Sequence, residues 1–201
     1  MIIETVEQLR TLYQAPTERL IKKQLSSLDV HCRHFIQLSP FVIIASTSRS
    51  YATDSSPRGG APGFIKVLDD QTLIIPDAPG NNRIDTFQNI IETGHVGLLF
   101  LIPGVEETLR VNGTARLSTC EKLITHFVEE ERPPKLVIEV TAAEVFLHCP
   151  KALMRSNLWL PSAQVDRSSL PTVIEMINDQ TGIILPVQSQ EETRKIFAKD
   201  L

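Results

Sequence analysis

The sequence predicts a mainly β protein with added helices, an α+β fold in which six strands form a closed or partly closed antiparallel barrel. Six runs between positions 41 and 147 are apolar or alternate between apolar and polar residues, as strands do. Short turns join several of these runs, which favours antiparallel pairing. Only the segment around Asn89 reads as a helix between two strands, so a doubly wound parallel sheet is poorly supported.

The first 40 residues read as helical. Thr5 and Gln8 have the spacing of a capping box, and Pro16-Thr17-Glu18 opens a second helix. A third helical segment runs from about Asp29 to Leu38. We therefore expect a helical N-terminal extension over residues 1–40.

The barrel is expected over residues 41–148. Its strands are predicted at 41–45, 64–68, 72–76, 96–102, 107–117 and 136–147. Residues 49–63 read instead as a long polar loop shaped by Gly and Pro. Loops of this length inside a compact domain are usually functional.

Helices are also predicted inside the barrel and after it. Apolar residues recur with helical spacing at 84–91, and Ser118 and Glu121 form a capping box for a helix that ends near Glu130. After Leu147 the chain changes to short helices and bends, which defines a C-terminal helical segment over 149–201. The whole chain, 1–201, is expected to be a single domain of this three-part organisation.

Composition and charge narrow the classes of partner. The formal net charge is −4, which gives no overall basic field for nucleic acid. No stretch approaches the ~20 apolar residues of a membrane span. The N-terminus is acidic rather than basic, unlike a signal peptide. We therefore expect a cytoplasmic protein that binds neither nucleic acid nor membrane.

The cysteines and histidines do not indicate a metal centre. Cys32, Cys120 and Cys149 are odd in number and far apart, so they form neither a disulfide framework nor a paired-cysteine zinc site. His31 and His34 lie one helical turn apart, but no acidic or sulfur ligand follows at the next turn. The roles of these two histidines and of Cys149 are left open.

Asn81-Asn82-Arg83 lies in the connection between an apolar strand predicted at 72–76 and the helix predicted at 84–91. The first N–H groups of a helix are unpaired and the helix dipole is positive there, so an arginine beside them would complete a phosphate site. A second interpretation is an ordinary helix start, with Asn81 or Asn82 as the cap and Arg83 as a solvated charge. Spacing alone leaves both interpretations open.

Two further cations precede this turn. Arg58 lies in the loop predicted at 49–63, and Lys66 lies in the strand that follows it. If adjacent antiparallel strands bring Arg58, Lys66 and Arg83 together, the three would suit a phosphate monoester. The alternative is that Arg58 is a surface charge in a flexible loop.

Several short segments, taken in their order along the chain, resemble the sequence pattern of a known family. The relevant segments are Ser56-Pro-Arg58, Pro62-Gly-Phe-Ile-Lys66, Thr72-Leu-Ile-Ile-Pro-Asp77, Pro79-Gly-Asn-Asn-Arg83, Val96-Gly-Leu-Leu-Phe-Leu-Ile-Pro-Gly104 and Glu107-Thr-Leu-Arg-Val-Asn-Gly-Thr-Ala-Arg-Leu117. From about Phe41 to Trp159 the chain resembles the pyridoxamine 5′-phosphate oxidase-like family of FMN-binding split β-barrels. It is most similar to a bacterial branch of uncharacterised FMN-binding proteins in that family. The resemblance implies a six-stranded antiparallel split barrel of Greek-key type.

The same resemblance implies a homodimer with FMN between the subunits. Arg58 and Lys66 match two cations of the family pattern, although three extra residues separate them here. Asn81, Asn82 and Arg83 replace a Ser-Arg-Lys type sequence, so one of two cations is kept. The other FMN-binding residues that it implies are Phe64, Ile65, Pro76, Asp77, Thr108 (from the partner subunit), Arg155, Ser156 and Trp159.

For function, the resemblance implies an FMN-dependent oxidoreductase acting on an unknown small molecule. The substrate-phosphate residues of the vitamin B6 oxidase are not recognisable, which argues against pyridoxamine phosphate as the substrate. No side chain is assigned as a catalytic acid, base or nucleophile. Two alternatives stay open: a non-catalytic flavin-binding or sensor protein, and a split-barrel protein that uses haem or a deazaflavin.

Overall fold

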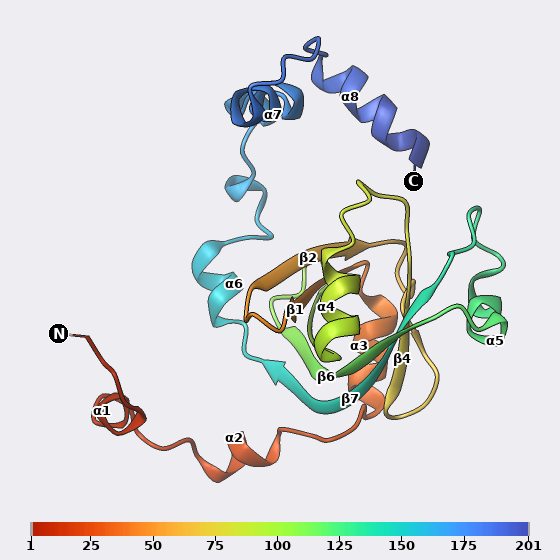
Figure 1. The fold of residues 1–201 in the computed structure, drawn as a ribbon. Helices are drawn as coiled ribbons and strands as arrows, with labels where there is room; N and C mark the ends of the chain where they lie inside the picture. Colours follow the sequence, from red (N-terminus) through yellow and green to blue (C-terminus); the bar gives the residue numbers. More distant parts are fainter. Residues whose placement is uncertain (1, 201) are drawn as a thin grey trace.

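A curled antiparallel sheet of seven strands forms the body of the protein in the computed structural model, which describes residues 2–200 (Figure 1). The strands are β1 (Phe41–Thr47), β2 (Thr53–Gly59), β3 (Lys66–Val67), β4 (Thr72–Pro76), β5 (His95–Leu101), β6 (Thr108–Ser118) and β7 (Val137–His148). Their order is β2-β1-β5-β6-β7-β4-β3. Hydrogen bonds do not close the sheet, because β2 and β3 remain its two edges. The α+β class and the antiparallel pairing are confirmed, and the open sheet is consistent with a split barrel.

The prediction of six strands is wrong by one, because β2 lies inside the segment expected to be a loop. Its sequence, Thr53 to Gly59, is polar and contains a proline, so it has no apolar strand signal. The strand forms because it is an edge that pairs only with β1, with Pro57 opposite Ile43. Proline is tolerated on an edge strand, where its missing N–H costs no ladder hydrogen bond. Arg58 is therefore held in a strand rather than in a flexible loop.

The main core lies between the inner face of the sheet and two helices, α3 (Val30–Leu38) and α4 (Asp85–Thr93). Val42 and Ile44 of β1 alternate inward with the apolar residues of β5 and β6 opposite them. Leu28, Cys32 and Ile36 close the core from the α3 side. Residues 60–65 carry the chain from one sheet edge to the other, and Phe64 and Ile65 are buried on the way.

A smaller cluster on the other side of β4 explains two differences from the predicted elements. Ile74, Phe127 and Val137 form this cluster, beneath α5 (Glu121–Ile124) and a 3₁₀ turn, η1 (Thr125–Phe127). The helix predicted to reach Glu130 thus ends early. Ser118 does not cap it as predicted, because its hydroxyl accepts from the Cys120 N–H instead. The strand predicted at 64–68 is shortened to β3, since Phe64 and Ile65 turn into the core.

The first two and the last two α-helices of the chain lie away from the sheet in Figure 1. The N-terminal helices are α1 (Val6–Arg10) and α2 (Glu18–Lys22). The C-terminal elements are α6 (Lys151–Ser156), η2 (Pro161–Ala163), η3 (Arg167–Ser169), α7 (Val173–Thr181), α8 (Gln190–Phe197) and η4 (Ala198–Asp200). Thr172 and Glu175 form a capping box at the start of α7. Among the described residues, none of the helices combines the length and the apolar character needed to cross a bilayer.

The three cysteine thiols should differ sharply in their reactivity toward alkylating reagents, because only one of them is buried. Cys32 is 2 % exposed, and burial raises the pKa of its thiol from 9.0 to about 12, whereas Cys120 and Cys149 are exposed. At pH 8, iodoacetamide should therefore alkylate Cys120 and Cys149 and leave Cys32 unmodified until the protein unfolds, as peptide mass spectrometry can measure. Alkylation of native Cys32 at the rate of the other two would contradict this packing.

The raised pKa of Cys32 also makes the stability of the fold depend on pH in the alkaline range. The folded pKa of Cys32 lies above the unfolded one, so its contribution to stability is fully present below pH 9 and is lost as the pH rises toward 12. Cys32→Ala should flatten this part of the pH dependence.

Candidate phosphate and cofactor site

The turn before α4 adopts neither of the cap arrangements considered from the sequence. The helix begins at Asp85, and its N-cap position is Ile84, which has no side-chain cap. Asn81 Oδ1 accepts from the Arg83 N–H at 3.0 Å, which closes a small side-chain turn ahead of the helix. Asn82 has a φ of 61°, a left-handed conformation that asparagine tolerates better than most residues. The two asparagines therefore shape the turn and leave the first N–H groups of α4 without a side-chain cap.

Arg58 lies beside this helix. Arg58 belongs to β2, where it pairs with Val42 of β1 and faces inward. Its Cζ lies 5.6 Å from the ring centroid of Phe87, in the first turn of α4. Its Nε is buried and has no hydrogen-bond partner. A buried donor without a partner costs about 1–3 kcal/mol, so it is retained most readily where a ligand supplies the acceptor.

Arg83 is the second cation at this helix end. Its Nε lies 2.9 Å from Oδ2 of Asp85, and its side chain is 76 % exposed. The hydrogen bond and charge of Asp85 raise the pKa of Arg83. An anionic ligand would therefore compete with Asp85 for this guanidinium, a weak exposed pair that is easily rearranged.

A polar network that the sequence reasoning missed fixes α4 against the β1–β2 hairpin. The Asp54 carboxylate accepts from Thr86 Oγ1 at 2.7 Å and from Ser56 Oγ at 3.1 Å. Asn89 donates to Ser46 Oγ at 3.0 Å, and Thr86 and Asn89 are both buried. Asp54, Ser56 and Arg58 alternate along one face of β2, so the network sets where Arg58 meets α4. Treating residues 49–63 as a loop hid this alternation.

Lys66 does not join the two arginines. Its Nζ donates to the Gly63 carbonyl at 3.0 Å and lies 5.7 Å from the ring centroid of Phe127, in the smaller cluster. The side chains of Phe64 and Ile65 belong to the core, and Pro76 and Asp77 are half-buried at the end of β4. These five predicted residues therefore lie on or next to β3 and β4.

A third group of predicted residues lies around the start of β6. Thr108 is half-buried opposite His148, the last residue of β7. Trp159 donates from Nε1 to the Val105 carbonyl at 2.8 Å, which ties the segment after α6 to the β5–β6 turn. Arg155 and Ser156 hydrogen-bond only to carbonyls of their own helix, Lys151 and Leu153. The assignment of these residues to a cofactor site stays a prediction.

Next to Thr108 lies a cationic cluster that the sequence reasoning did not find. Lys23 and Arg110 lie over the Phe146 ring at 4.3 and 5.2 Å, and His148 meets its edge at 5.1 Å. Burial, followed by the charges of Arg110 and Lys23, lowers the pKa of His148. His148 is therefore neutral near pH 7, and its ring packs on Phe146.

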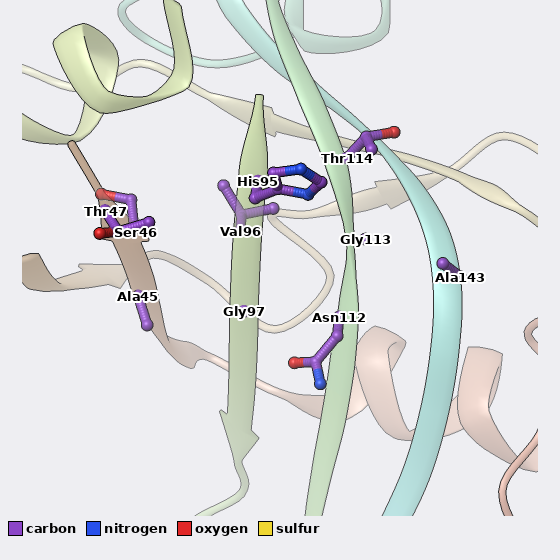
Figure 2. A pocket seen from close by; sticks show the side chains of 10 residues that line it. All are labelled: Ala45, Ser46, Thr47, His95, Val96, Gly97, Asn112, Gly113, Thr114 and Ala143. Atoms are coloured by element: carbon purple, nitrogen blue, oxygen red, sulfur yellow. The ribbon is translucent and has the colours of Figure 1, made fainter. Parts of the chain in front are cut away.

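A hollow in the sheet shares only Ser46 with the site residues described above. It has a volume of about 500 Å³ and opens on the outer face of β1, β5 and β6 (Figure 2). Its lining residues are Ala45, Ser46, Thr47, His95, Val96, Gly97, Asn112, Gly113, Thr114 and Ala143. None of the predicted site residues lines it, and its floor is made of small residues. The chemistry at Arg58 and α4 is the better guide to a ligand site than this hollow.

Comparison with known proteins places the chain in a family. Residues 28–149 match the family model for pyridoxamine 5′-phosphate oxidase, and the chain belongs to that family. No curated protein matches the sequence significantly.

Solved structures with the same fold are distant in sequence. A single-substitution variant of HupZ from Group A Streptococcus is 18 % identical, with a TM-score of 0.51 over 60 % of this chain and 99 % of its own. A protein from Lactobacillus delbrueckii described as a pyridoxamine 5′-phosphate oxidase by similarity is 20 % identical, with a TM-score of 0.51 over 62 % of this chain and 98 % of its own. At these identities the likeness shows the fold alone.

Proposed function

We propose that the protein is an FMN-binding flavoprotein whose phosphate site is formed by Arg58, Arg83 and the first turn of α4. The observation that carries the proposal is the buried, unpartnered Nε of Arg58 beside a helix N-terminus without a side-chain cap. Both features present N–H donors, and both suit an anion. Family membership supports the phosphate group of FMN as this anion, because members of the family commonly bind FMN.

In this proposal the remaining predicted residues surround the rest of the cofactor. Asn82 would donate to phosphate or ribityl oxygens, and Lys66 with the residues at the β3–β4 edge would line the ring. Thr108 would come from the partner subunit of a homodimer, with Arg155, Ser156 and Trp159 closing the site. FMN would supply one- and two-electron redox chemistry, while the protein positions it and sets its electrostatics.

An oxidoreductase acting on an unidentified small molecule is the activity that we propose. A non-catalytic flavin-binding protein is the second candidate, and one observation favours it. Two of the cations near Arg58 and Thr108 are held in ion pairs, Arg83 with Asp85 and Arg110 with Glu144. His148, which packs on Phe146 and is neutral near pH 7, is a candidate proton carrier beside Arg110.

The absorbance spectrum of the purified protein tests whether it binds FMN. Purified protein, or apoprotein mixed with FMN, should show a bound-flavin absorbance band near ~450 nm. A protein that neither retains nor takes up FMN would rule out both flavoprotein candidates, and a Soret band would identify haem instead. Turnover of the bound flavin with a reductant and an acceptor would separate the enzyme from the non-catalytic candidate.

Arg83→Ala should weaken FMN affinity about threefold to tenfold, because one solvent-exposed, charge-assisted contact is worth roughly 1 kcal/mol. The measurement is a titration of apoprotein that follows flavin fluorescence. Arg116→Ala is the matched control. Arg116, on β6, is also 76 % exposed, and it pairs with the carboxylate of Glu139 on β7. Equal affinities for the two variants would remove Arg83 from the phosphate site.

A further inference from the structure

The cationic cluster of Lys23, Arg110 and His148 on Phe146 holds N–H donors that the protein does not use. Within residues 2–200, the Arg110 side chain makes one hydrogen bond, from Nη2 to Glu144 Oε1 at 2.6 Å, and its Nε is buried without a partner. The Lys23 ammonium meets no carboxylate or carbonyl in that range and rests on the Phe146 ring, 4.3 Å from its centroid. A half-buried group of cations with unused donors is suited to an anion from outside the chain.

The backbone fixes the positions of these side chains. Arg110 stands opposite Phe146 in the β6–β7 ladder, and both are half-buried. Their side chains face away from the core, because that of Val145, the next residue on β7, points into it. Leu25 exchanges two backbone hydrogen bonds with Val145, at 2.9 and 2.8 Å, which brings Lys23 to the ring. The cluster is therefore built from three separate segments of the chain.

The cluster carries an excess of positive charge. Lys23 and Arg110 are cations, and the Glu144 carboxylate offsets only one of their two charges. His148 is neutral near pH 7, because burial and then the charges of Arg110 and Lys23 lower its pKa. Cation–π contacts with Phe146 replace only part of the hydration that the two cations lose. An anion bound here would supply both the missing charge and the missing acceptors.

The surroundings of the cluster favour a carboxylate attached to an apolar body. Leu99 of β5 stands opposite Arg110 on the other side of β6, and Leu101 follows it on the same face of the sheet. Both leucines are half-exposed. A ligand with its acidic group at Arg110 could therefore lay its remainder on these two side chains. One net positive charge matches a monoanion, and Glu144 beside Arg110 would repel the second charge of a phosphate group.

We propose that Lys23, Arg110 and His148 bind the carboxylate of a small acid whose apolar body rests on Leu99 and Leu101. Lys23 and the unused N–H groups of Arg110 donate to the carboxylate oxygens, and the N–H of neutral His148 adds a third donor. Phe146 holds the two cations in place.

This site goes beyond the proposed function, because it shares none of the residues assigned to FMN. Protein without flavin should therefore bind the acid. Loss of the proposed FMN site would leave acid binding in place, and absence of acid binding would leave the FMN site untouched.

The test is a titration of the full-length apoprotein with cinnamate and with cinnamyl alcohol, which has the same apolar body and no charge. Amide NMR spectra give both the affinity and the place of binding. Cinnamate should bind at least ~10-fold more tightly than the alcohol, because charge-assisted hydrogen bonds are the stronger ones. The largest shifts should lie at Arg110, Phe146 and His148. Equal affinities, no binding of cinnamate, or shifts confined to other parts of the chain would overturn the proposal.

Lys23→Gln should weaken cinnamate binding about threefold to tenfold, because it removes one charge-assisted contact. Lys22→Gln is the matched control. Lys22 is the adjacent lysine, its side chain is 75 % exposed, and it pairs with Glu18 at 2.6 Å. Neither lysine belongs to the core, so both variants should fold. Equal cinnamate affinities for the two variants would contradict the role of Lys23.

Inorganic phosphate separates the two classes of anion. It has no apolar body and carries more than one negative charge near neutral pH, so it should displace cinnamate only at a concentration at least ~10-fold higher than that of the acid. Displacement at equal concentrations would assign the cluster to phosphate groups and overturn its assignment to carboxylic acids.

Discussion

Arg58→Ala should weaken FMN binding by about 10-fold to 150-fold, because hydrogen bonds to a charged group are worth roughly 1.5–3 kcal/mol. The loss should exceed that of Arg83→Ala. Arg83 is exposed and shared with Asp85, whereas Arg58 is half-buried and its Nε has no other partner. Fluorescence titration of apoprotein measures both variants on the same scale.

Arg58→Lys separates charge from geometry. Lysine keeps the positive charge but lacks the planar fork, so its affinity should fall between those of wild type and Arg58→Ala. Stability gives a second readout. Replacing Arg58 by leucine removes the unpartnered buried donor, so apoprotein stability should be unchanged or higher while FMN affinity falls. A variant that loses both stability and affinity would assign Arg58 a structural role instead.

Gly113→Ala should destabilise the fold by about 3 kcal/mol, the upper end of the usual cost of overpacking, because the clash is with backbone. A β-carbon at Gly113 would lie 2.0 Å from the Thr141 carbonyl oxygen, which belongs to the backbone of β7. The β6–β7 register shifts at Asn112 and Gly113, so the two strands approach closely there. Neither backbone can retreat without breaking the longest ladder of the sheet.

Gly80→Ala provides the comparison for that substitution. The nearest atom to a β-carbon at Gly80 is 4.0 Å away, and its φ is not left-handed. The same chemical change should therefore be neutral or slightly stabilising there, by up to ~1 kcal/mol. Urea unfolding of both variants measures the difference, and equal free energies of unfolding would contradict the close approach at Gly113.

The sequence predicted most of the barrel because its inner strands carry strong periodic signals. β4 was predicted at its observed limits, and β6 and β7 to within a residue or two, since buried alternation is a local property. β2 could not be predicted in this way. Its inward residues, Asp54, Ser56 and Arg58, are polar, and their partners come from β1 and α4 rather than from neighbours in the chain.

The candidate site was predicted in part for a similar reason. Residue types and their order indicated Arg58 and Arg83, which the fold places at the same end of α4. The expected convergence of Lys66 with them stays a prediction, because Lys66 has partners of its own, the Gly63 carbonyl and the Phe127 ring. The pairing of Arg83 with Asp85 depends on rotamers and charges that follow from the folded turn, and the sequence pattern did not indicate it.

The central claim is that Arg58, Arg83 and the start of α4 bind the phosphate of FMN. The most direct measurement is calorimetric titration of apoprotein with FMN and with riboflavin, which lacks that phosphate. We predict that wild type binds FMN at least ~10-fold more tightly than riboflavin, and that Arg58→Ala loses most of this difference because the lost contact is the phosphate one. Equal affinities for the two flavins in wild type, or no binding of FMN, would contradict the account.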